Sequence, residues 1–192
     1  MTDGSKISIE NRDVQDVQAD TVALQHGTAR DVRAETVDLL QSGVQSLTAD
    51  RVAVRQGGVQ TVSAREVTVR QGGIVQVEAD SVSVQQGGVA LVHSQNVTTA
   101  ASSVGVALAG GNVTLDQSIS RAVIAQQAAT IDQSAVGATI TRTAVVNNSA
   151  VVFLVAGKVE GTVKPLFDTT AAVVFGAVAG VVFALISRFR RR

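Results

Sequence analysis

Residues 44–88 read VQSLTADRVAVRQGG, VQTVSAREVTVRQGG and IVQVEADSVSVQQGG when the chain is cut every 15 residues. The three copies follow one another without an insertion. A fixed period of this kind predicts a repeat architecture, in which each unit packs on the next. Repeat positions are counted from Val44, which is position 1.

Apolar or small residues occupy positions 1, 4, 6, 9, 11 and 14 of each copy. They form pairs two residues apart, which is the spacing of one face of a β-strand. Each pair starts five residues after the previous one, so the alternation is reset three times per copy and the chain must turn a corner each time. The pattern predicts an all-β fold, a triangular single-stranded β-solenoid (β-helix) with 15-residue coils.

Two other regular structures do not fit this period. On an α-helix, each 15-residue step would rotate the apolar positions by about 60°, at roughly 100° per residue, so no apolar stripe would survive three copies. In a flat meander, an odd period would move every side chain to the opposite face at each repeat. Corners that reset the phase are therefore required.

The period extends in both directions from these copies. Towards the N-terminus, positions 9 and 11 are apolar as far as Ile7 and Ile9. Near residues 107–111 the register slips by one, and a looser period of 15 to 16 carries two Asp-Gln-Ser motifs and one Asn-Asn-Ser motif. Val151, Val155, Val159 and Val163 extend the pattern, so we expect a solenoid over residues 7–163 with roughly ten coils.

Particular positions predict ladders of like side chains along the rod. Position 6 carries small residues, which let opposite valines meet in a narrow core. Position 13 carries glutamines and position 7 carries charges that alternate in sign, and we expect both on solvated corners. We also expect the Gly-Gly pairs to serve corners that need positive φ. The small residues at position 6 are Ala19, Ala34, Ala49, Ala64, Ala79 and Ser94. The glutamines at position 13 are Gln41, Gln56, Gln71 and Gln86, and the charges at position 7 are Asp50, Arg65 and Asp80.

The C-terminal end has a different composition. After a lead-in at 1–6 and the solenoid, we expect a linker at 164–170, a transmembrane helix at 171–187 and a basic tail at 188–192. Residues 171–186 contain no polar side chain, and with their neighbours they would span about 28 Å as a helix, close to the ~30 Å hydrocarbon core of a bilayer. Gly176 and Gly180 have the spacing that lets membrane helices approach closely.

The orientation of this anchor is open. The N-terminal residues have no apolar core of the kind found in a signal peptide, which favours a tail-anchored protein with a cytoplasmic solenoid. The arginines at 188–192 favour the cytoplasmic side for themselves, which would place the solenoid outside. We predict a membrane protein with a single-pass C-terminal anchor and a cytoplasmic solenoid.

The residue types needed for most site chemistry are scarce. The chain has no cysteine, and its 16 basic and 16 acidic residues balance, so neither thiolate chemistry nor a field that recruits nucleic acid is expected. His26 and His93 are far apart in the repeat and have no companion at metal-ligand spacing. We predict no catalytic, cofactor-binding or metal site, no small-molecule substrate and no enzyme activity.

A valine-rich, glycine-punctuated triangular coil of this size resembles the bactofilins, the polymer-forming β-helical cytoskeletal proteins of bacteria. The resemblance covers about residues 5–163 and consists of repeat style. It implies nucleotide-independent assembly and a scaffolding role at the membrane. The strict 15-residue period and the C-terminal position of the apolar segment differ from that family.

Together these observations favour a non-enzymatic, membrane-anchored scaffold that forms a homo-oligomer. Ile7 and Ile9 would lie on an uncapped first coil, so we predict self-association there, assisted by Gly176 and Gly180 in the bilayer. A different class, a surface stalk or adhesin that displays one face of the solenoid to a ligand, is the alternative. A hydrolase that acts on an extended polysaccharide is a third hypothesis.

Overall fold

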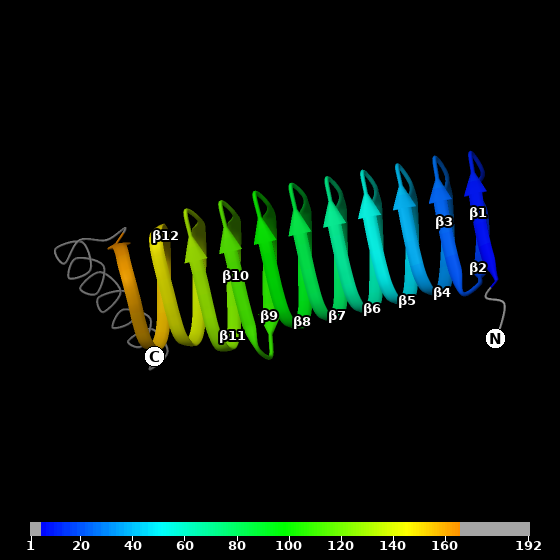
Figure 1. The fold of residues 1–192 in the computed structure, drawn as a ribbon. Coiled ribbons are helices and arrows are strands. Elements are labelled where there is room, and N and C mark those ends of the chain that lie inside the picture. The colour runs from blue at the N-terminus through cyan, green and yellow to red at the C-terminus, as the bar shows by residue number, and fades with distance from the viewer. Residues whose placement is uncertain (1–4, 166–192) are drawn as a thin grey trace, which may run out of the picture.

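The computed structural model describes the backbone of residues 5–165 and the side chains of residues 5–161. These residues form a straight rod of stacked coils, with the first and last strands at opposite ends (Figure 1). All strand pairs are parallel, and all belong to one sheet. The strands are β1 (Lys6–Glu10), β2 (Val14–Gln18), β3 (Thr21–Gln25), β4 (Thr28–Leu40), β5 (Gly43–Arg55), β6 (Gly58–Arg70), β7 (Gly73–Gln85), β8 (Gly88–Ala100), β9 (Ser103–Ala109), β10 (Asn112–Asp116), β11 (Ile119–Asp132) and β12 (Ala135–Pro165).

The register between neighbouring coils confirms the β-solenoid and its 15-residue period. In β5 and β6, Val44 pairs with Val59 and Val52 with Val67. Pairing is interrupted three times per coil, at positions 2, 7 and 13–14, for example between Gln45 and Gln60. These interruptions are the three corners that the sequence predicts, and they divide each coil into three sides of unequal length.

One of the three corners is sharper than the others. Among residues 5–165, ten non-glycine residues have positive φ, and each stands at position 13 or its equivalent: Asn11, His26, Gln41, Gln56, Gln71, Gln86, Ala101, Gln117, Gln133 and Asn148. Nine complete turns therefore separate Asn11 from Asn148. With a partial coil at each end, this agrees with the number of coils expected from the sequence.

The core is a continuous column of small and medium-sized apolar side chains along the axis of the rod. Val62, Val67 and Val69 are completely buried, at positions 4, 9 and 11 of one coil. Position 6 also points inward, where Ala64 is packed against the core and Ala79 belongs to it. The predicted inward pairs and the ladder of small residues are therefore both confirmed.

The prediction that the Gly-Gly pairs supply positive φ is wrong. The glutamine before each pair adopts that conformation instead, with φ near 55° at Gln56 and Gln71. The first glycine is needed for a different reason, because a Cβ on Gly72 would lie 2.6 Å from the carbonyl oxygen of Gly57 in the previous coil. In the coils that carry glycine here, the stacked backbones approach too closely for a side chain, whereas the coils with Ser102 or Ser118 at the same position accommodate one.

The register slip predicted near residues 107–111 is confirmed and lies at one corner. Up to Ala109 the offset between coils is 15 residues, and from Val113 it is 16. The additional residue enlarges the position 7 corner, at Gly110–Gly111 and again at Gln126–Gln127. The offset returns to 15 after this corner in β12. The sides of the coil keep their register because the corner absorbs the additional residue.

The Asp-Gln-Ser motifs form a buried serine ladder at the sharp corner. The hydroxyl groups of Ser118 and Ser134 each donate to a carbonyl oxygen two residues earlier, at 2.6 Å in both cases. Each hydroxyl oxygen also accepts a hydrogen bond from a backbone N–H of the previous coil, as Ser134 does from the N–H of Ser118 at 3.0 Å. Serine therefore satisfies the backbone at a position that glycine occupies in the central coils.

The predicted glutamine ladder is present, and the predicted alternation of charge at position 7 brings Asp50 and Arg65 together. The side-chain amide of Gln41 donates to Gln56 at 3.1 Å, and the same bond links Gln56 to Gln71 and Gln71 to Gln86, both at 3.2 Å. At the position 7 corner, Arg65 forms an ion pair with Asp50. The hydrogen bond from Arg65 holds the pKa of Asp50 below its ordinary value. Both side chains are exposed, so the pair contributes little to stability.

The last described coil differs from the sequence expectation at two residues. Val155 and Val159 continue the apolar pattern in the sequence, but their side chains are 63% and 47% exposed, whereas Leu154 and Ala156 pack against the core. These two residues occupy positions 4 and 6, so the coil keeps the register of the repeat. The predicted transmembrane helix at 171–187 lies outside the described residues. In the part that is described, no helix is long and apolar enough to cross a membrane.

Candidate interaction surfaces

The predicted self-association residues on the first coil are Ile7 and Ile9. They pair with Val22 and Leu24 of the second coil and are partly buried against the core. Within the described residues, β1 pairs only with β3. The outer edge of β1 is therefore an open strand edge, of the kind that templates pairing with another strand. Gly176 and Gly180 lie outside the described residues.

Both histidines are exposed, as the repeat positions predict. His26 stands at the sharp corner, and His93 points outward from β8. Among residues 5–165, no group of histidine, aspartate and glutamate side chains is arranged to hold a metal ion. Asp116 and Asp132, from the Asp-Gln-Ser motifs, occupy the same register position in neighbouring coils.

An outward-facing apolar surface, the apolar stripe, covers one side of the C-terminal half of the rod. It consists of two parallel rows on the side that carries positions 3 to 6. Register pairs connect Leu91 to Val106 in one row, and Leu108 to Ile124 to Ile140 in the other. Fifteen residues beyond Ala138 and Ile140, Phe153 and Val155 continue the two rows. The stripe comprises Leu91, Val106, Ala122, Ala138 and Phe153 with Leu108, Ile124, Ile140 and Val155.

In the coil that contains Ile140, an apolar side chain points outward while polar side chains point into the core. Thr139 and Thr141 point inward and are buried, while Ile140 between them points outward and is 49% exposed. The Thr139 hydroxyl is the one buried side-chain polar atom in the described residues that has no hydrogen-bond partner. An exchange of Thr139 and Ile140 would place an apolar side chain in the core and remove the unpartnered hydroxyl, so packing of the core does not explain the outward isoleucine.

The same side of the rod is polar in its N-terminal half. At positions 3 and 5 the early coils carry Asp31 and Arg33, then Ser46 and Thr48, then Gln76 and Glu78. In the C-terminal half, the corners that border the stripe carry Arg121 and Arg142, both exposed. Neither makes a salt bridge to another described residue. The side therefore changes from mixed polar character to apolar with basic borders along its length.

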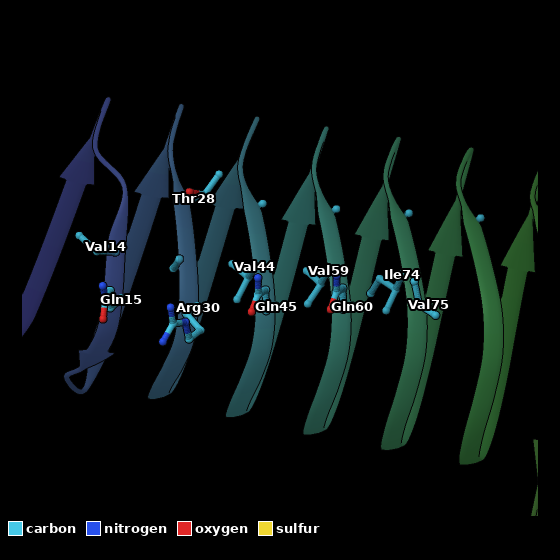
Figure 2. A pocket seen from close by; sticks show the side chains of 15 residues that line it. Val14, Gln15, Thr28, Arg30, Val44, Gln45, Val59, Gln60, Ile74 and Val75 are labelled. Atoms are coloured by element: carbon cyan, nitrogen blue, oxygen red, sulfur yellow. The ribbon is translucent and has the colours of Figure 1, made fainter.

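A second feature, the glycine groove, runs along the shortest side of the N-terminal half. It is a wide, shallow depression of about 740 Å³, lined by Gly43, Gly58, Gly73 and Gly88 with neighbouring residues. Gln15, Arg30, Gln45, Gln60 and Val75 follow one another along the adjoining corner (Figure 2). A Cβ on Gly73 would find no atom closer than 4.0 Å. Packing therefore does not require glycine there, in contrast to Gly72.

Neither surface was identified from the sequence. The stripe has a signal there, because positions 3 and 5 become apolar after Leu91. That signal is concealed by the inverted Thr-Ile-Thr pattern at residues 139–141, which suggests the opposite strand face. The groove forms because four consecutive coils omit a side chain at one outward position.

Comparison with protein-family models, with curated proteins and with solved structures finds no match. The resemblance to the bactofilins therefore remains one of repeat style. What the structure shares with that family is the β-solenoid itself.

Proposed function

We propose that this protein is a non-enzymatic scaffold, anchored to a membrane by residues 171–187 and self-associating through its rod. The observation that carries the proposal is the outer edge of β1, which pairs with no other strand of the described part of the chain and would present Ile7, Ile9 and backbone groups to a second rod. A stack of coils repeats the same backbone geometry at every level, so one terminal coil can act as a template for another.

Membrane attachment is supported by the sequence after the solenoid. The segment 171–186 has no polar residue, and arginines occupy four of the five positions 188–192. A soluble helix that is apolar on all faces has to be buried, and a rod whose core is a narrow column of valines offers no interior for it. A bilayer provides the missing apolar environment, and the terminal arginines would reach its headgroups.

The anchoring part of the proposal is tested by flotation with vesicles. The full chain is expected to float with phospholipid vesicles and to stay with them after carbonate washing, whereas a chain that ends at Asp168 is not. Circular dichroism of the shorter chain serves as the control that the β-solenoid is intact. Equal flotation of the two chains would show that the anchor lies elsewhere.

The glycine groove favours a second candidate function, a binding module that displays one face of the solenoid. Glycine at position 15 is not demanded by packing, and it exposes a strip of backbone beside a row of glutamine amides. Such a strip fits an extended polymer chain, with hydrogen bonds from the amides. An array of linear glycans would test this, with Gly58→Thr plus Gly73→Thr as the filled-groove variant, since Thr28 already occupies the same register position.

A further inference from the structure

We propose that the apolar stripe is a lipid-binding surface, by which the C-terminal half of the rod lies against an anionic membrane. The inference rests on the proposed membrane anchor and adds a second, peripheral contact to it. It concerns a side of the folded solenoid rather than the tail, and it predicts how the rod is oriented relative to the bilayer.

The chemistry of the stripe matches a membrane interface. Its most exposed members are Ile124, Ile140, Phe153 and Val155, with 40, 49, 59 and 63% of their surface accessible. The bordering charges, Arg121 and Arg142, are basic and form no salt bridge with another described side chain. An apolar surface bordered by basic side chains is the arrangement with which proteins bind the headgroup region of anionic bilayers.

The position of the stripe along the chain brings it to the bilayer. The stripe ends at Val155, and the apolar segment begins 16 residues later at Ala171. From Pro165, the last described residue, to Ala171 the chain can extend at most about 20 Å at 3.3–3.6 Å per residue. When the segment is inserted in a bilayer, the last coils are therefore held near its surface, where Phe153 and Val155 can reach the lipid.

The size of the stripe argues against a second copy of the rod as its occupant. With roughly 200 Å² for a large side chain, the exposed fractions of its four most accessible residues give about 400 Å². A stable protein dimer buries about 800 Å² on each partner. The four most accessible apolar side chains thus supply about half of the area that a stable dimer buries on each partner, whereas a surface of this size suffices for a second contact of a chain that is already anchored.

The polar first half of the same side limits the contact to one end of the rod. Outward positions there carry Asp31, Arg33 and Glu78, a polar surface of mixed charge that has no large apolar side chain to bury in a bilayer. The rod is therefore expected to meet the membrane with its C-terminal coils and to extend its N-terminal half into water. This tilt leaves the open edge of β1 free for another rod.

The absence of cysteine from the chain permits a direct test. Single cysteines replace Ile124 or Ile140 in the stripe, and an environment-sensitive nitrobenzoxadiazole dye is attached to the full-length protein. Two matched controls carry the dye at Thr48, which has the same repeat position as Ile140 in the polar half, and at Asn147, which lies on another side of the same coil as Ile140. The proteins are mixed with vesicles of three parts phosphatidylcholine and one part phosphatidylglycerol.

Dyes at Ile124 and Ile140 are expected to shift to the blue and to be quenched by nitroxide-labelled lipid, with iodide quenching reduced at least threefold relative to Thr48 and Asn147. Stripe dyes as open to iodide as the controls would overturn the inference. Stripe dyes shielded from both quenchers would also overturn it, because protein would then cover the stripe. If the protein itself fails to float with vesicles, the anchor proposal is wrong, whereas flotation without lipid quenching rejects the stripe alone.

Replacing Arg121 and Arg142 together with glutamine tests the basic borders without altering the stripe. The lipid quenching of a dye at Ile140 is then expected to fall at least twofold on vesicles that contain phosphatidylglycerol, and to lose its sensitivity to salt. Unchanged quenching and unchanged salt dependence would contradict an anionic partner.

Discussion

The two glycines of the Gly72–Gly73 pair differ in how much space surrounds their Cα atoms. Gly72 lies where stacked backbones approach to within 2.6 Å of the space that a Cβ would fill, whereas Gly73 borders open solvent. Neither residue has a positive φ. The pair is therefore a clean comparison between a glycine required by packing and one that packing leaves free.

Gly72→Ala is expected to lower the free energy of unfolding by about 1–3 kcal/mol, the usual cost of overpacking a tight contact. Gly73→Ala should be neutral or stabilising by up to ~1 kcal/mol, because alanine restricts the unfolded chain. Urea denaturation followed by circular dichroism measures both. Equal losses from the two changes would contradict the assignment of the close approach to the first glycine.

The buried hydroxyl of Thr139 predicts a stabilising substitution. Thr139→Val removes a polar group that has no partner and keeps its shape, so the free energy of unfolding should rise by about 1 kcal/mol or more. The matched control is Thr99→Val, because the Thr99 hydroxyl donates to Ser118 at 3.1 Å in the same kind of interior. That change should destabilise by about 1 kcal/mol. Thermal unfolding curves that rank the two variants the other way would be inconsistent with the inward position of Thr139.

At the scale of the strand, alternation of the two faces within β6 makes the strongest test of the coil. Val67 is completely buried, and Thr68 points outward between two valines. Val67→Asp would place an unpaired charge in the core and should cost at least ~3 kcal/mol. Thr68→Asp should change stability by less than ~0.5 kcal/mol. Denaturant midpoints of the two variants measure the difference, and similar shifts would argue against the β-solenoid register.

The strands and corners could be predicted from the sequence because each depends on a periodic choice between apolar and polar residues. Val52, Val67 and Val82 recur at a fixed interval, and only a coil with three corners places them on one face. Which corner residue takes positive φ could not be predicted, since both glutamine and glycine recur there. The structure shows positive φ at position 13 whether glycine follows, as after Gln71, or serine, as after Gln117, so the conformation belongs to the corner and not to the Gly-Gly pair.

The candidate surfaces were harder to predict, because the local sequence does not say which face of a strand points into the core. Ile140 lies between two threonines, and locally its strand could present either face to the core. The register is set by distant neighbours such as Val136 and Val146, which are buried in the same coil. The sequence alone therefore predicts that a face exists but does not identify which side of the rod becomes apolar.

At the scale of the whole molecule, the open first coil predicts concentration-dependent assembly. The full chain in mild detergent is expected to form oligomers larger than a monomer in light scattering, with contacts at Ile7 and Ile9. Changing both residues to lysine should reduce the mass, because two charges on the terminal coil repel a second copy that carries the same pair.

The control for this prediction is Thr48→Lys plus Thr68→Lys, which adds the same charge to outward positions away from the end of the rod. This variant should assemble as the unchanged chain does. A chain that remains monomeric at high concentration, or equal losses from the two double variants, would rule out assembly through the first coil.

The offset of 15 residues between Gly58–Arg70 and Gly73–Gln85 also has a consequence for the gene. Every side chain in one coil stands above the residue of the same repeat position in the next, so duplication of one 15-residue unit in the coding sequence keeps the apolar positions aligned and leaves the register of the core unchanged. Each duplication would lengthen the rod by about 4.8 Å and leave both ends unchanged. The length of the rod is then set by the number of repeat units, and unequal recombination between the similar central units would change that number one unit at a time.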